Sequence, residues 1–247
     1  MGDVLVTGGT GNLGRVVVAK LRDAGHDVVV LSRRAQPGHS VRGDLRTGEG
    51  IPAAVAGVDT ILHLATAPRG DAEACSRLIA ATEPGGPHLV FTSVVGVDRI
   101  PLRYYLAKME CERLIQTSGL PFTIQRATQF HSLVFRLFAT QRRLPLLVAP
   151  ACDFQPIDVH DVADRLIEHV AAGPRERVPD IGGPEVRSAN SLAQSYLTAT
   201  GRRRKIVGVG LPGRIFGGFR AGANLAPHHA EGTVTFEDFL DGRLRPR

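Results

Sequence analysis

Long hydrophobic runs are missing from this sequence of 247 residues. Its most apolar stretches, such as LPLLVAP at residues 144–150, are much shorter than the roughly 20 residues of a membrane-spanning helix. The N-terminal residues MGD lead directly into a strand-like segment, without the basic and apolar regions of a signal peptide. We therefore expect a cytoplasmic protein without a membrane span.

Cysteine is scarce, and its few positions do not form a metal-ligand pattern. The three cysteines are widely separated: Cys75, Cys111 and Cys152. The histidines that invite a metal hypothesis are His131, His160, His228 and His229. None of them has a carboxylate or a second histidine at ligand spacing on one helix face. We expect reduced thiols, as in a cytoplasmic protein, and no metal site.

The composition is ordinary, with 43% hydrophobic and 22% charged residues, and this is typical of a folded, water-soluble protein. The net charge of +6 raises the question of an anionic partner. The dense basic clusters are GRRRK at residues 201–205 and RLRPR at the C-terminus, and neither contains stacking aromatic residues. We therefore expect solvated loops here, and no specific binding of nucleic acid.

Short β-branched segments alternate with segments of helical length along the first half of the chain. The strand-like segments are residues 3–7, 27–32, 60–65, 88–93 and 121–126, and the helical ones are residues 12–24, 70–82 and 102–118. Parallel strands need crossover connections and are buried on both faces. The alternation predicts an α/β fold with a doubly wound parallel sheet of the Rossmann type.

Beyond about residue 128 the alternation becomes irregular. Asp158 or Asp161 can cap the helix that follows them. Because we find no internal repeat, linker or domain boundary, we expect a single domain over residues 1–247. Its portion from about residue 128 would pack on the same sheet and form a substrate pocket. The glycine-rich segment 208–227 is either a mobile lid or an irregular packing segment.

The most informative stretch is DVLVTGGTGNLGRVVVAKL at residues 3–21. It places a glycine-rich loop between the first predicted strand and an amphipathic helix. Glycines there permit a tight turn and let backbone N–H groups approach a pyrophosphate. We predict that this loop binds a dinucleotide through Gly8, Thr10, Gly11, Asn12, Leu13 and Gly14.

The end of the second predicted strand indicates which dinucleotide is bound. NAD-specific sites carry an acidic residue about 20 positions after the loop, where it holds the ribose hydroxyls. Here the strand ends in Ser32, Arg33 and Arg34. Guanidinium groups suit a 2′-phosphate, so we predict NADP(H), although both arginines could be only a solvated strand end. Asp44, beside Leu45, either accepts a hydrogen bond from the adenine or is an ordinary turn aspartate.

Several motifs together resemble the short-chain dehydrogenase/reductases, and most closely their atypical, NmrA-like branch of NAD(P)H-binding proteins. These motifs are VTGGTGNLG, LSRR, GDL, ILHLA, VFTSVVGVD, YYLAK and GLPFTIQRATQF, and they are continued by FQPIDVHDVAD and VPDIGGPEV. The likeness covers nearly the whole chain. It implies that Ala65 and Thr66 line the nicotinamide side of the cofactor site.

The resemblance also implies a catalytic set: a serine or threonine, a tyrosine, and a lysine four residues after the tyrosine. Tyr104 and Lys108 match the last spacing, and residues four apart share one helix face. The lysine would place a positive charge near the phenol and hold the ribose hydroxyls. The tyrosine would protonate a carbonyl oxygen as hydride arrives at the carbon.

Two details of the catalytic set stay open. In extended relatives the catalytic hydroxyl follows a Ser/Thr doublet, but here Val94 follows Thr92 and Ser93. Either one of these two residues supplies the hydroxyl from a slightly different place, or the oxyanion is less well supported and the chemistry is weak or altered. We name Ser93. Tyr105 also neighbours Lys108 on a helix, but it belongs to the apolar stripe that we expect to be buried, with Leu102, Leu106, Met109 and Leu114.

The sequence thus predicts an NADPH-dependent oxidoreductase that reduces a carbonyl, quinone or enone of a moderately apolar small molecule. One alternative is a non-catalytic NADP(H)-binding sensor or regulatory protein. Another is an epimerase or isomerase that uses the bound nucleotide transiently. The expected partner is a small-molecule substrate, and homo-oligomer formation is left open.

Overall fold

The computed structural model describes residues 2–34, 36–67 and 69–244. The chain forms two compact units that alternate along the sequence. Unit 1 comprises Met1–Ser93, Arg103–Arg126 and Val162–Pro179. Unit 2 comprises Val94–Leu102, Ala127–Asp161 and Asp180–Arg247. Because the units interleave, no single position separates them, which explains why the sequence shows no domain boundary.

Unit 1 contains a seven-stranded sheet in the order β3-β2-β1-β4-β5-β6-β9. The strands are β1 (Asp3–Thr7), β2 (Asp27–Ser32), β3 (Ser40–Arg42), β4 (Thr60–His63), β5 (His88–Val94), β6 (Phe122–Ala127) and β9 (Glu176–Arg177). The strand order reverses between β1 and β4, and neighbouring strands are parallel. The doubly wound α/β prediction is confirmed.

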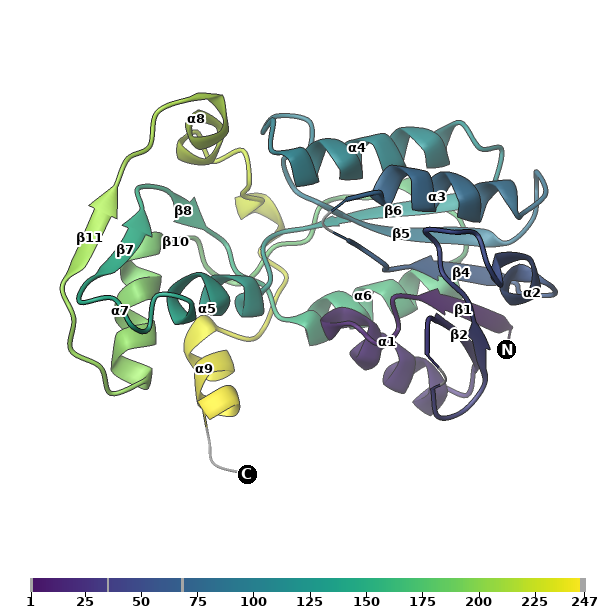
Figure 1. The fold of residues 1–247 in the computed structure, drawn as a ribbon, viewed down its shortest axis with the longest axis horizontal. Coiled ribbons are helices and arrows are strands. Elements are labelled where there is room, and N and C mark those ends of the chain that lie inside the picture. The colour runs from purple at the N-terminus through teal and green to yellow at the C-terminus, as the bar shows by residue number, and fades with distance from the viewer. Residues whose placement is uncertain (1, 35, 68, 245–247) are drawn as a thin grey trace. The chain divides into compact units, whose positions relative to one another are not determined.

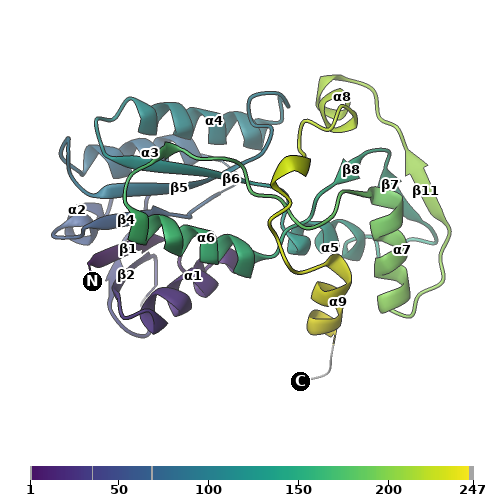
Figure 2. The same cartoon turned by 180° about the vertical axis from the view of Figure 1, so that it is seen from behind.

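Helices cover both faces of this sheet. They are α1 (Asn12–Asp23), α2 (Ile51–Val55), α3 (Asp71–Ala80), α4 (Arg103–Gln116) and α6 (Val159–Ala172). Helices α3 and α4 lie on one face, and α1 and α6 lie on the other (Figures 1 and 2). A core cluster fills the α3/α4 face with Leu5, Ile61, Leu89, Phe91, Cys111 and Ile115, among others. Alternate strand residues from 5, 61 and 89 onward therefore face α3 and α4.

The burial of α4 confirms one part of the prediction and corrects another. Tyr105 is 4% exposed, as predicted, whereas its neighbour Tyr104 is 39% exposed. The expectation that Leu106 and Met109 are buried is wrong, because they are 45% and 40% exposed. The buried stripe consists of Tyr105, Lys108, Cys111, Glu112 and Ile115. The helix is thus rotated away from its most apolar face, because two charged residues have partners on the sheet.

Glu112 is one of these buried charges, and its partner is Arg126 at the end of β6. The Arg126 guanidinium donates from Nε to Glu112 Oε1 at 2.8 Å and from Nη2 to Oε2 at 2.7 Å. The two side chains are only 11% and 5% exposed. A buried charge needs such a partner, because its desolvation is otherwise costly. The ion pair therefore fixes the rotation of α4 and, with it, the direction of Tyr104 and Lys108.

Unit 2 has its own core and two small sheets, β10-β8 and β11-β7. Its elements are α5 (His131–Ala139), β7 (Leu147–Pro150), β8 (Asp153–Phe154), β10 (Arg187–Ser188), α7 (Ala189–Ala199), β11 (Ile206–Val209), α8 (Arg214–Arg220), the 3-10 helix η1 (Pro227–His229) and α9 (Phe236–Leu244). Asp158 caps α6, because its Oδ1 accepts the His160 N–H at 2.8 Å. Asp161 instead accepts from the Thr233 hydroxyl at 2.7 Å. The expectation that the portion from about residue 128 forms a substrate pocket stays a prediction.

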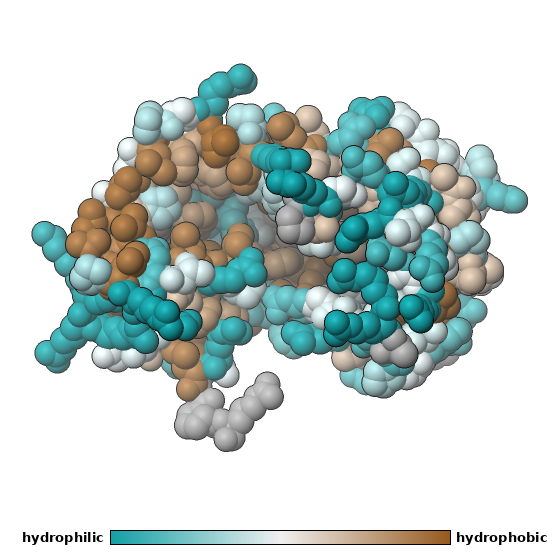
Figure 3. Space-filling view, in the orientation of Figure 1, coloured by the Kyte–Doolittle hydropathy of each residue, from teal (hydrophilic) through white to brown (hydrophobic). Residues whose placement is uncertain are grey.

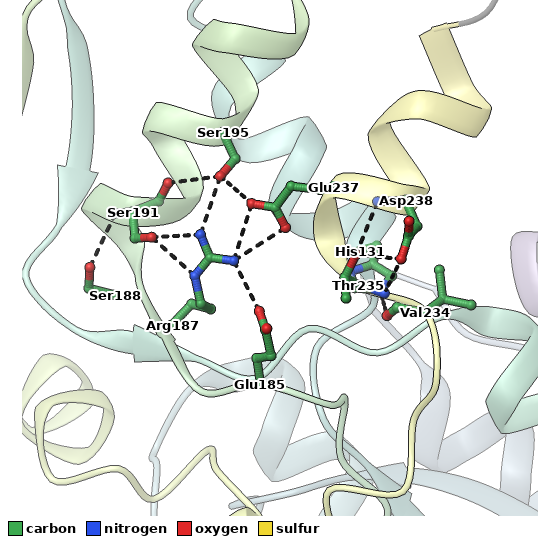
Figure 4. A network of polar contacts seen from close by, with 10 residues as sticks. All are labelled: His131, Glu185, Arg187, Ser188, Ser191, Ser195, Val234, Thr235, Glu237 and Asp238. Atoms are coloured by element: carbon green, nitrogen blue, oxygen red, sulfur yellow. Dashed lines mark hydrogen bonds and ion pairs between the residues drawn. The ribbon is translucent and has the colours of Figure 1, made fainter.

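A polar network ties α9 to α7 in unit 2 (Figure 4). The Arg187 guanidinium donates to Ser191 Oγ at 2.7 Å and to both carboxylate oxygens of Glu237 at 3.2 Å. Glu237 also accepts from the Ser195 hydroxyl at 2.6 Å. Arg187 forms a further ion pair with Glu185 at 3.0 Å. The network holds the C-terminal helix in place, which is a structural role.

The glycine-rich segment 208–227 is partly anchored. Gln129 Nε2 donates to the Asn224 carbonyl at 3.0 Å, and the Ala226 N–H donates to Gln155 Oε1 at 2.7 Å. Asn224 and Gln155 are fully buried. Helix α8, in the middle of the segment, has no buried residue. The end of the segment therefore packs into unit 2, in agreement with the packing alternative.

Unit 2 also exposes apolar side chains, and in Figure 3 these gather over β7 and β11. Leu144, Leu146 and Leu211 flank these strands and are 49%, 38% and 43% exposed. Homo-oligomer formation stays open.

Among the described helices, none is both long and apolar enough to cross a membrane. Within the same residues, no cluster of three histidine, cysteine or acidic side chains could hold a metal ion.

Two buried histidines of unit 1 predict a loss of stability in acid. His88 Nε2 contacts Thr123 Oγ1 at 2.9 Å, and His169 Nε2 contacts Gln125 Oε1 at 2.9 Å. Burial lowers the pKa of each histidine from 6.5 to about 4. For His169, the charges of Arg165, Arg175 and His88 lower it further. The unfolded chain therefore binds more protons than the folded one between pH 6.5 and 4, so stability falls as the pH falls through this window.

We expect the free energy of unfolding to fall by about 1 kcal/mol per pH unit for each histidine in this window. Urea unfolding at pH 7.5, 6, 5 and 4.5 would measure it. In His169→Gln, which cannot be protonated, the decline should be shallower by about one histidine's share. Equal slopes for the variant and the wild-type protein would contradict the assignment.

Candidate functional site

The loop between β1 and α1 has a geometry that excludes side chains at the glycines. Gly8 has a φ of +74°, and a Cβ there would lie 2.6 Å from the backbone nitrogen of Ala65. A Cβ at Gly14 would overlap the carbonyl oxygen of Gly8. The Gly11 N–H donates to that same oxygen at 2.9 Å and closes the turn. No side chain therefore covers the backbone N–H groups of the glycines, and a pyrophosphate can approach them closely.

The start of α1 is suited to an anion. Its N-cap residue is Gly11, which supplies no side-chain acceptor, and the first turn contains no acidic residue. Thr10, Gly11 and Asn12 are exposed, whereas Leu13 and Gly14 are buried. The positive end of the helix dipole is therefore turned outward without a carboxylate that would compete with a phosphate. The predicted loop residues thus fit the phosphate groups of a dinucleotide.

At the end of β2 the structure gathers three exposed cations around Ser32. Arg33 and Arg34 follow Ser32 and are exposed. Arg42, which the sequence reasoning missed, ends β3 directly beside Ser32 in the parallel register and is also exposed. Only strand pairing brings residues 32 and 42 together, so their proximity was not predictable from local sequence patterns.

Asp44 and Leu45 form the turn after β3. The Arg46 N–H donates to Asp44 Oδ1 at 2.8 Å, and the Asp44 N–H donates to the Glu49 carbonyl at 3.0 Å. Leu45 packs against the core cluster of the α3/α4 face. One oxygen of the Asp44 carboxylate therefore acts as a turn cap. A contact of Asp44 with the adenine stays a prediction.

The loop after β4 is held by the first residue of α3. Asp71, which is 6% exposed, accepts from the Thr66 hydroxyl and from the Ala67 N–H, both at 2.6 Å. The Ala65 N–H donates to Thr7 Oγ1 at 3.4 Å. The loop around Ala65 and Thr66 is therefore fixed beside the carboxyl ends of β1 and β4. In open α/β sheets, ligands bind at this edge where the strand order reverses.

Lys108 is buried at the same edge of the sheet, with 3% of its surface exposed. Its Nζ donates to the Thr92 carbonyl at 3.3 Å and lies over the Phe91 ring, 4.6 Å from the centroid. The same nitrogen is 6.0 Å from the centroid of the Tyr104 ring. The structure therefore brings the predicted tyrosine and lysine together, above the end of β5.

The hydroxyls of Thr92 and Ser93 are buried without a hydrogen-bond partner in the part of the chain that the structure describes. Successive strand residues point to opposite faces of a sheet. Phe91 faces α4, so Ser93 shares that face with Lys108, and Thr92 points to the other side. The Ser93 hydroxyl is therefore available for a hydrogen bond to a molecule bound on the face of Lys108.

His63, at the end of β4, is a residue that the sequence reasoning missed. Its Nδ1 contacts Thr7 Oγ1 at 2.7 Å, and its ring stacks on Phe91 at a centroid distance of 5.6 Å. Burial and the charge of Lys108 lower its pKa to about 3. His63 is therefore neutral at physiological pH and connects the start of the glycine loop to the ring beneath Lys108. A lone histidine within the apolar segment ILHLA was the available signal.

Comparisons with known proteins agree with this geometry. A family model described as NAD(P)H-binding matches residues 8–169. The NAD(P)H azoreductase of Xenophilus azovorans is 24% identical over 221 residues, which cover 84% of this chain and 77% of that protein. The photosystem II assembly factor Ycf39 of Trieres chinensis is 28% identical over 167 residues, and these span 59% of this chain but only 52% of that longer protein.

Among solved structures, the NADPH-dependent quinone oxidoreductase QOR2 of Escherichia coli, in complex with NADPH, has the same fold. The TM-score is 0.84, with 17% identity over 98% of this chain and 100% of that one. At this level of identity the likeness bears on the fold. The family match covers more than half of the chain and includes the glycine loop, the strands from β2 to β6 and α4. This chain therefore belongs to the NAD(P)H-binding family of atypical short-chain dehydrogenase/reductase-type proteins.

Proposed function

We propose that the protein is an NADPH-dependent oxidoreductase that reduces a carbonyl, quinone or enone of a moderately apolar small molecule. The observation that carries this proposal is the grouping of Tyr104, Lys108 and Ser93 at the carboxyl edge of the sheet. Tyr104 is exposed, whereas Lys108 and Ser93 are buried. The family membership supports a nicotinamide cofactor at the same edge.

In the proposed reaction each side chain has one task. A nicotinamide cofactor, when bound, would supply hydride for the substrate carbon. The Ser93 hydroxyl, which has no protein partner among the described residues, donates a hydrogen bond to the substrate oxygen. Tyr104 gives its phenolic proton to that oxygen as negative charge develops there. Lys108 stabilises the resulting phenolate with its positive charge and holds the ribose hydroxyls.

Steady-state assays of NADPH oxidation test the proposal on a panel of quinones, enones and aldehydes. The name of the quinone oxidoreductase that shares this fold favours quinones as the first class to assay. We propose that the portion from about residue 128 forms the substrate pocket. Failure of every substrate on the panel, while NADPH still binds, would count against the proposed activity.

We also propose that NADPH binds more tightly than NADH. Ser32, Arg33, Arg34 and Arg42 offer a hydroxyl and three guanidinium groups to the 2′-phosphate, and the end of β2 has no carboxylate. We expect Arg33→Asp to reduce the preference by about tenfold or more, because it replaces an attractive charge by a repulsive one. Fluorescence titration of both nucleotides measures this. Equal affinities of the wild-type protein for NADPH and NADH would refute the proposal that these side chains bind the 2′-phosphate.

A second candidate function is that of a non-catalytic NADP(H)-binding regulatory protein. It is favoured by Val94, which stands where extended relatives carry the catalytic hydroxyl, and by the assembly-factor name of one relative. Such a protein would bind NADPH and a protein partner without turnover. An epimerase or isomerase would use the same residues, and it would differ by showing no net oxidation of NADPH.

A further inference from the structure

Tyr104 borders a pocket of about 200 Å³ in unit 1. The loop after β4 and the first turns of α3 and α4 form its walls. Its lining includes Ala67, Arg69, Gly70, Asp71, Glu73 and Arg103. A molecule in this pocket would therefore be close to the proposed proton donor.

Two guanidinium groups line this pocket, one from each wall. Arg69 belongs to the loop and Arg103 is the first residue of α4, and both are exposed. Among the residues that the structure describes, neither side chain forms an ion pair or donates a hydrogen bond. By contrast Arg113, at the other end of α4, pairs with Glu110 at 2.6 Å. The arginines beside Tyr104 thus keep their donors available.

The acidic residues of the lining differ in their availability. The Asp71 carboxylate is buried, and its two oxygens accept from Thr66 and Ala67, so it serves the loop. Glu73 is exposed and has no cationic partner in the described chain. The groups that can meet a ligand are therefore two guanidinium groups and one carboxylate, an excess of one positive charge. The first turn of α3 begins at the pocket, with Gly70 as an N-cap that lacks a side-chain acceptor.

We infer that the substrate carries an anionic group, a carboxylate, sulfonate or phosphate, which Arg69 and Arg103 hold while Tyr104 serves the reacting oxygen. This inference rests on the proposed function for the role of Tyr104. Guanidinium groups bind such oxyanions through paired N–H donors, and two of them on opposite walls fix the orientation of the ligand. The Glu73 carboxylate repels the anionic group of the substrate and so reduces the net attraction to the two arginines. The substrate is accordingly an apolar carbonyl compound or quinone with a charged end.

The test compares two quinones that differ by one anionic group, 1,2-naphthoquinone and 1,2-naphthoquinone-4-sulfonate. The readout is the ratio of kcat/KM for the sulfonate to that for the parent quinone. We expect Arg69→Ala and Arg103→Ala each to lower this ratio by about three- to tenfold. Glu73→Gln should raise it by about two- to fivefold, because it removes the opposing charge. Added salt should reduce the ratio for the wild-type protein.

Arg113→Ala is the matched control, since it removes a cation from α4 far along the helix and should leave the ratio unchanged. A loss of packing would not produce shifts of opposite sign at Arg103 and Glu73. If the arginine variants turned over both quinones with the same ratio of kcat/KM as the wild-type protein, the inference would be wrong, but the proposed activity would stand.

Turnover is not needed to decide the inference. If neither quinone were reduced although NADPH bound, the proposed function would fail on its own. Calorimetric titration of the NADP⁺-loaded protein with both quinones then decides the inference. Tighter binding of the sulfonate that is lost in Arg69→Ala and Arg103→Ala would support it. Equal binding of both quinones to the wild-type protein would overturn it.

Discussion

Tyr104→Phe should lower kcat by about a hundred- to ten-thousandfold and leave the affinity for NADPH within about twofold, since general acid catalysis contributes factors of that size. The substitution removes one phenolic oxygen from a side chain that is 39% exposed, and it removes little packing. The measurement is steady-state turnover on any substrate that the panel identifies, with NADPH affinity determined in parallel.

Tyr105→Phe is the matched control, because the same atom is removed from the neighbouring ring. Tyr105 is 4% exposed, so we expect near-normal turnover, with any loss appearing as stability. Lys108→Ala should weaken both turnover and NADPH binding, since Lys108 would serve the phenol and the ribose together. If Tyr104→Phe turned over a true substrate at the wild-type rate, Tyr104 would not be the proton donor.

Gly14→Ala should weaken the binding of both NADPH and NADH by about a hundredfold, which corresponds to an overpacking cost of about 3 kcal/mol. The added methyl group would overlap the carbonyl oxygen of Gly8, which is backbone and cannot rotate away. The loop must then move, and its backbone N–H groups no longer point toward the pyrophosphate. Nucleotide titration measures the effect, and the rise of Tm on adding NADPH should shrink with it.

Two further variants measure the role of the loop in nucleotide binding even if Gly14→Ala folds poorly. At Gly11 a Cβ would lie 3.2 Å from the Gly8 oxygen, so Gly11→Ala should show a milder loss of affinity in a folded protein. At Gly242, in α9, a Cβ meets nothing within 4 Å, so Gly242→Ala should bind nucleotide normally. Normal binding by both Gly11→Ala and Gly14→Ala would place the pyrophosphate elsewhere.

The fold and the nucleotide loop were predictable because their signals are local. Alternating β-branched and helical segments indicate the parallel sheet, and the elements observed at Asn12–Asp23, Asp71–Ala80 and Arg103–Gln116 match the predicted helices to within two residues. The glycine spacing indicates the loop because only residues without a Cβ fit there. The spacing between Tyr104 and Lys108 likewise follows from helix geometry alone.

The orientation of α4 was not predictable from its apolar pattern. Leu106 and Met109 lie outside, whereas Lys108 and Glu112 lie inside. Burial of these charges depends on Arg126 and on the carbonyl of Thr92, which are distant in the sequence. A pattern of hydrophobic residues along one helix contains no information about a charged or polar partner on another strand.

The sequence by itself determined the class of fold, the dinucleotide loop and the pairing of Tyr104 with Lys108, because each depends on residues within one or two neighbouring elements. Only the tertiary structure decided that Ser93 faces Lys108, that His63 contacts Thr7, and that Arg42 lies beside Ser32. It also decided that Arg69 and Arg103 line one pocket. These neighbours come from different strands and loops, and strand order and register, which bring them together, are set by packing of the whole sheet rather than by local spacing.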